Sequence, residues 1–182
     1  MLTNLALITD SLTRLIETVV KASPEWSSFS PVLTVSPQPP DRLKGSAESN
    51  ILGFYLWRIS DDAAYKNLPL PENATRSQTS SRLVLHYQLT AHAEESDQGV
   101  LQEQLVMGLA MQALRHYSLI DGTTEVEGIN NQMVRILHPA LPAGSRLRIT
   151  HVPMPYDRAP GYWEPPPGPV RLAAYYQVTE AV

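Results

Sequence analysis

The hydrophobic pattern is clearest between residues 82 and 121, where a strand pattern gives way to a helix pattern. From Leu83 to Ala91 apolar and polar side chains alternate, which is the period of a strand with one buried face. A polar turn follows, with Asp97 as the predicted N-cap of a helix that stops before Asp121-Gly122. The predicted apolar stripe of this helix comprises Leu101, Leu105 and Leu109, with Val106, Ala110, Ala113 and Tyr117 beside them. We expect this strand and helix to pack on each other, with Gly108 permitting close approach to the sheet.

The remaining patterns predict a second long helix and five more strands. Thr3 to Lys21 has apolar residues at helical spacing, and Ser23-Pro24 ends the pattern. The predicted strands run from Val32 to Ser36, Ile51 to Ile59, Ile129 to Leu137, Arg146 to Val152 and Val170 to Val178. Ile51 to Ile59 is nearly all apolar, which indicates cover on both faces. The fold class expected is α+β: a single mixed β-sheet of about six strands with two main helices packed on one face.

Composition and charge narrow the function classes. A chain of 182 residues is expected to form one domain, residues 1–182. The net charge of −4 gives no indication of a nucleic-acid partner or of an anionic membrane surface. The absence of cysteine excludes disulfides and thiolate metal sites. We expect a protein made in the cytoplasm without a signal peptide, because polar residues interrupt the first apolar stretch, and without a membrane span.

The sequence contains no motif typical of catalysis. The phosphate-binding and dinucleotide-binding glycine patterns and the nucleophile elbow are all absent. His92-Ala93-Glu94 matches half of a zinc deaminase signature, but the other half requires cysteines. His86 and His92 are expected on one strand about 20 Å apart, too far to share a metal. Asp61-Asp62 is expected in a solvated turn and not as a catalytic carboxylate pair. We therefore predict no catalytic residue, cofactor or metal.

The strand, acidic turn and helix carry a family resemblance. The run LHYQLTA followed by LxxxLVMGLAMQAL is similar to the tail-terminator (cap) proteins of extracellular contractile injection systems, which are phage-tail-like particles such as the antifeeding prophages. Further matching features come in the family's order: the short strand Val32–Ser36, PPD at Pro39–Asp41, GFYLWRI at Gly53–Ile59, Asp61-Asp62, Asn67, Trp163 and Tyr175-Tyr176. The sequence departs from the pattern at residues 164–169, EPPPGP, which separate the tryptophan from the last strand.

The resemblance implies a structural protein and not an enzyme. Family members form six-fold rings on the last ring of the inner tube and also meet the last sheath ring, so the implied partners are further copies of the chain, the tube protein and the sheath protein. Such a protein is in the cytoplasm at assembly and then belongs to a particle that can be released. The candidate interface residues are Trp57, Asp61, Asp62, Trp163 and Tyr175, within or beside the strand Val170–Val178 and the loop Asp61–Arg76.

Two alternatives stay open at this point. One is an adaptor or baseplate component of the same particle. The other is a small enzyme, such as a hydrolase, whose serine, histidine and acid converge only in the folded chain. The residues alone do not choose among the three.

Overall fold

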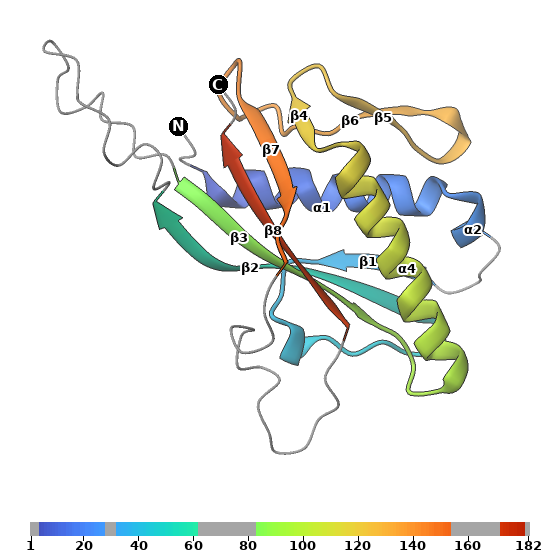
Figure 1. Cartoon of the computed structure of the whole chain (residues 1–182). Helices are drawn as coiled ribbons and strands as arrows, with labels where there is room; N and C mark the ends of the chain where they lie inside the picture. Colours follow the sequence, from blue (N-terminus) through green and yellow to red (C-terminus); the bar gives the residue numbers. More distant parts are fainter. Residues whose placement is uncertain (1–3, 28–31, 62–82, 154–171, 181–182) are drawn as a thin grey trace, which may run out of the picture.

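The computed structural model describes residues 4–27, 32–61, 83–153 and 172–180. In these residues a six-stranded sheet has the order β1-β2-β3-β8-β7-β4, and β5 and β6 form a separate two-stranded sheet (Figure 1). The helices are α1 (Leu5–Ala22), α2 (Pro24–Ser27) and α4 (Asp97–His116), with short turns η1 (Pro40–Arg42) and η3 (Ile129–Asn131). The strands are β1 (Val32–Ser36), β2 (Ser49–Asp61), β3 (Leu83–His92), β4 (Leu119–Asp121), β5 (Glu125–Glu127), β6 (Met133–Arg135), β7 (Arg146–His151) and β8 (Ala173–Glu180). The predicted α+β fold is confirmed.

The large sheet is mixed because one of its pairs is parallel. β1 runs parallel to β2, and every other neighbouring pair of strands is antiparallel. The two long helices, α1 and α4, lie on the same face of this sheet (Figure 1). Their buried side chains join those of the sheet in one hydrophobic core.

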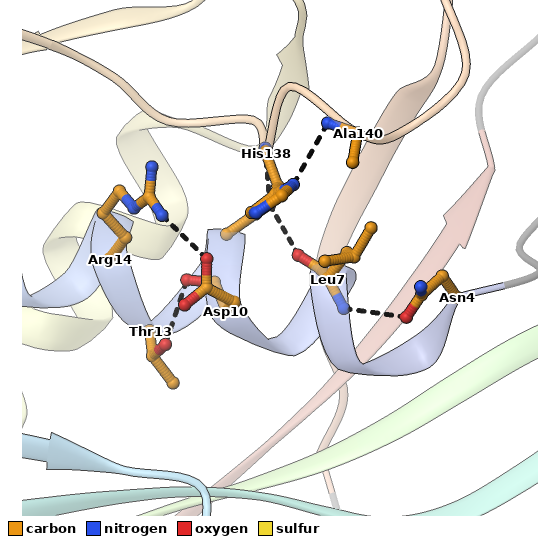
Figure 2. Close-up of polar contacts among 8 residues, drawn as sticks. Asn4, Leu7, Asp10, Thr13, Arg14, His138 and Ala140 are labelled. Carbon is orange, nitrogen blue, oxygen red and sulfur yellow. Dashed lines mark hydrogen bonds and ion pairs between the residues drawn. The ribbon is translucent and has the colours of Figure 1, made fainter.

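Helix α1 follows the predicted pattern closely. Its buried residues recur at helical spacing and comprise Ile8, Ser11, Leu12, Leu15, Ile16 and Val20. At the start of the helix, the side chain of Asn4 accepts a hydrogen bond from the Leu7 N–H at 3.3 Å (Figure 2). Ser23 is extended because a proline follows it, and the helix therefore ends at Ala22. The predicted stop at Ser23-Pro24 is confirmed.

Helix α4 differs from the prediction in its cap and in its rotation. Ser96, and not Asp97, is the N-cap, since its hydroxyl accepts a hydrogen bond from the Gly99 N–H at 3.0 Å. Leu101 is 66% exposed, and Leu105 and Leu109 are only half-buried. The sheet side of the helix is formed by the predicted Val106, Ala110 and Ala113 together with Met107 and Leu114. Gly108 is exposed, and a Cβ added there would meet no atom within 4 Å. The expectation that Gly108 packs closely on the sheet is wrong.

The central strand β3 is buried on both faces. Leu85, Tyr87 and Leu89 belong to the core under the helices, where the ring of Tyr87 stacks on Phe54 with centroids 4.6 Å apart. Gln88 on the opposite face is also fully buried, as are Thr90 and His92. Leu43, just after η1, packs on this second face, because its Cδ1 lies 2.7 Å from where a Cβ on Gly53 would be. The prediction that β3 has only one buried face is wrong for this reason.

The segment between α4 and β7 contains more elements than the pattern predicts. The predicted stop at Asp121 lies beyond the helix, because α4 ends at His116 and β4 follows it. The predicted strand from Ile129 to Leu137 begins with the turn η3, in which Asn130 has a positive φ of 61°. Strands β4 and β5 were not predicted, since three residues are too few to show a period.

Candidate assembly surface

The order of the strands decides which edges an added strand can reach. The edge strands of the large sheet are β1 and β4. β8 lies between β3 and β7, and its residues from Tyr176 to Thr179 have a strand partner on both sides. The strand predicted at Val170–Val178 is therefore not an edge strand of the sheet, and its part in an interface stays a prediction.

Two of the candidate residues, Trp57 and Tyr175, lie together on the face of the sheet that faces away from α1 and α4. Their rings meet edge to face with centroids 6.3 Å apart, and Trp57 also meets the ring of His86 at 5.9 Å. Trp57 sits at a β-bulge, where the β2–β3 register shifts between Leu56 and Arg58. A bulge reorients the side chain beside it, and the side chain of Trp57 is half-buried here.

Polar atoms beside this aromatic pair are buried. Gln88 donates a hydrogen bond through Nε2 to the Tyr175 hydroxyl at 3.3 Å, while its Oε1 has no hydrogen-bond partner in the described part of the chain. The indole Nε1 of Trp57 is buried there without a partner as well. Burial, together with the charge of Arg58, lowers the pKa of His86 below its usual 6.5. Both effects favour the neutral form of His86, and the cluster combines aromatic rings with buried polar groups.

The remaining candidates are separated from this pair or lie outside the described residues. Asp61 is the exposed last residue of β2 and pairs with Leu83, whereas Tyr175 pairs with Gln88. Five residues along β3 correspond to about 16 Å. Asp62, Trp163 and the loop Asp61–Arg76 after its first residue lie outside the described residues.

A further feature, absent from the sequence predictions, is an open slot at the edge of the sheet. β2 has 13 residues, but β1 has five and pairs only with Ser49 to Gly53 (Figure 1). Among the described residues, the rest of β2 has no strand on that side. Helix α1 borders the slot, and a groove of about 590 Å³ lies between them. The unequal lengths of the predicted strands were the available signal, but their pairing could not be read from the pattern.

The family model described as the Pvc16 N-terminal domain matches residues 7–182. The chain belongs to the Pvc16 N-terminal domain family. The resemblance inferred from the order of the sequence motifs is thereby confirmed.

A solved structure has a similar fold to this Pvc16 N-terminal domain. It is the PVC sheath/tube terminator of an extracellular contractile injection system, determined by cryo-EM in the extended state. The two chains align with a TM-score of 0.55 and 14% sequence identity, over 98% of this chain. The aligned region covers 56% of the terminator, so this chain spans little more than half of its length. No curated protein matches the sequence.

The exposed apolar side chains of this Pvc16 N-terminal domain are scattered over several elements. Those of the described residues are Val32, Ile59, Val100, Leu101, Leu119, Ile129, Met133 and Leu172. Val100 and Leu101 are adjacent in the first turns of α4, and Leu119 and Val32 belong to the two edge strands. Exposed apolar side chains scattered in this way are common on protein surfaces and do not by themselves mark an interface.

Two further findings on the described residues concern metal binding and membrane-spanning helices. Within them, no group of three or more histidine, aspartate or glutamate side chains is placed to hold a metal ion. In the same parts of the chain, no helix has the length and hydropathy needed to cross a bilayer.

Proposed function

We propose that this chain is a structural subunit that caps the inner tube and sheath of a contractile injection particle. The observation that carries the proposal is the match of the Pvc16 N-terminal domain family to nearly the whole chain. The likeness of its fold to a sheath/tube terminator supports the same role. The chain is a structural protein in this proposal, and it carries out no catalysis and binds no cofactor.

The proposed arrangement is a ring, six-fold as expected from the family resemblance, with residues 1–182 as one unit. A closed ring repeats one modest contact at each subunit, so the assembly is stable although no single interface is strong. The ring contacts the tube protein on one side and the sheath protein on another. It is made in the cytoplasm and stays with the particle when the particle is released.

The proposed contacts include the aromatic pair Trp57 and Tyr175 and the exposed end of β2 at Asp61. Trp57 combines a large ring with a buried indole N–H that has no partner in the described chain. Aromatic residues of this kind are enriched at the centres of protein interfaces. Asp62 and Trp163 remain candidates on sequence grounds alone.

Deleting the gene in the producing strain tests the proposal. Particles without the protein are expected to be overlong, variable in length or unstable in negative-stain micrographs, and the wild-type gene is expected to restore their length. Particles of normal length with normal sheaths would contradict the cap role. Loss of the baseplate end with normal length control would indicate an adaptor or baseplate component instead.

A further inference from the structure

The open slot beside β2 has the backbone chemistry to bind an extended peptide. The Val32 N–H of β1 donates to the Glu48 carbonyl at 2.8 Å, which fixes the residues of β2 that point toward β1. Backbone groups alternate sides along a strand, so Asn50 and Leu52 also point toward β1. By the same alternation, Leu56 directs its N–H and C=O into the slot, beyond the end of β1. Among the described residues no strand pairs with β2 at this point, and an unpaired strand edge is where an added strand binds.

The groove above the slot restricts which side chains an added strand can carry. On its helix side the groove is lined by small residues of α1, among them Ala6, Thr9 and Thr13. Val35 and Leu56 line the sheet side. Alternate side chains of an added strand would point into this space, where apolar or β-branched groups fit between the helix and the sheet.

The charges on the groove are acidic. Asp10 and Glu17 both line it. Their ion-pair partners are Arg14 and Lys21, and neither of these lines the groove. A lysine or arginine on the added strand would therefore meet carboxylates along α1, and an acidic residue would be repelled.

The same charges argue against a second copy of this chain as the occupant. The other edge strand of its large sheet, β4, has only three residues and ends at Asp121. Hydrogen bonds from Thr123 lower the pKa of Asp121, so this residue stays ionised at neutral pH. Placing it against Asp10 or Glu17 would bring like charges together.

We propose that the slot binds an extended segment of another protein of the particle, with alternating apolar side chains and at least one lysine or arginine facing α1. The proposal rests on the proposed function, because it takes the partner from the same particle. Pairing with β2 through backbone hydrogen bonds would hold the cap to its neighbour.

Photocrosslinking in assembled particles tests the slot. A photoreactive phenylalanine analogue replaces Ala6, which lines the groove, or Ala143, an exposed loop residue that does not line it. The expected adduct at position 6 joins this chain to an extended segment of a different particle protein, identified by mass spectrometry, and position 143 gives no such adduct. Adducts at position 6 only within the chain or to a second copy, or none in particles that contain the labelled protein, would overturn the proposal.

A matched pair of variants measures the strength of the contact. Ala6→Trp fills the groove and is expected to reduce incorporation into particles at least tenfold, with a melting temperature like that of the wild type. Ala143→Trp is expected to incorporate normally. Normal incorporation of Ala6→Trp would contradict the proposal that the slot binds a segment of another particle protein. Finding the wild-type chain away from the end of the particle would instead contradict the proposed cap function. In that case the crosslink at position 6 alone decides whether the slot binds another protein.

Discussion

The buried hydroxyl of Ser11 in α1 accepts a hydrogen bond at 2.9 Å from the backbone N–H of His138, 127 residues later in the chain. The same hydroxyl donates to the Leu7 carbonyl at 2.7 Å. His138 in turn accepts a hydrogen bond through Nδ1 from the Ala140 N–H at 3.1 Å (Figure 2). One serine in the apolar stripe of α1 therefore links this helix by a hydrogen bond to the loop that leads from β6 to β7.

Ser11→Ala is expected to lower the free energy of unfolding by about 1–3 kcal/mol, because the His138 N–H loses its partner. Chemical denaturation followed by circular dichroism measures the change. Ser27→Ala removes an exposed hydroxyl that bonds only the Pro24 carbonyl among the described residues, and a change within about 0.5 kcal/mol is expected. Equal effects of the two substitutions would show that the Ser11 link contributes nothing of its own.

Leu85→Asp is expected to abolish soluble folded protein, because Leu85 is fully buried among the core residues under the helices. Gln88 lies on the opposite face of β3, and an aspartate there would be tolerated only if that face were exposed to water. Since Gln88 is also fully buried, we expect Gln88→Asp to destabilise the protein by at least about 2 kcal/mol.

Thr150→Asp on β7 is the control for both changes, because Thr150 is exposed. We expect its melting temperature to stay near that of the wild type. A native circular dichroism spectrum and melting temperature for Leu85→Asp would mean that the faces of β3 are assigned wrongly.

Alkaline pH is expected to destabilise the protein through Tyr87. Burial raises the pKa of Tyr87 to about 12, against 10.0 in the unfolded chain, and its hydrogen bond to Thr9 partly opposes the shift. The unfolded state therefore loses this proton first, so the stabilisation is complete below pH 10 and is lost as the pH rises toward 12. A shift of this size corresponds to a loss on the order of 2–3 kcal/mol.

Denaturant midpoints between pH 9 and pH 11.5 measure this effect. Tyr87→Phe lacks the ionisable hydroxyl, and its stability is expected to fall less steeply over that range than that of the wild type. Parallel curves for the two proteins would contradict the assignment of the alkaline loss to Tyr87.

Gly108→Ala is expected to stabilise the isolated protein by about 1 kcal/mol, because alanine has the better helix propensity and an added Cβ meets no other atom. Gly99→Ala, in the first turn of the same helix, is the matched contrast. There a Cβ would collide with the Glu94 carbonyl, and we expect a loss of stability. Thermal melts of both variants measure these changes in stability. A lower melting temperature for Gly108→Ala would contradict the exposed position of Gly108.

The sequence predicted the long elements and missed those whose form depends on distant parts of the chain. The stop at Ser23-Pro24 was predictable because a proline restricts the residue before it. The rotation of α4 was not, because Leu101 and Val106 are both apolar, and only packing against α1 and the sheet shows which of them is buried. The buried second face of β3 depends on Leu43 and Tyr175, which are far away in sequence.

The candidate surface was predicted only in part. Trp57 was chosen as a large aromatic residue and Tyr175 because the family resemblance places a tyrosine in the last strand, and the β2–β3–β8 pairing places their rings against each other. The slot beside Leu56 depends on where β1 stops along β2, and strand register leaves no local signal in the sequence.

Electron cryomicroscopy of intact particles from the wild-type strain tests the central claim most directly. The account predicts one ring of this fold at the end of the tube opposite the baseplate, in contact with both the last tube ring and the last sheath ring. Density for this fold at the baseplate, along the length of the particle, or nowhere on it would contradict the account.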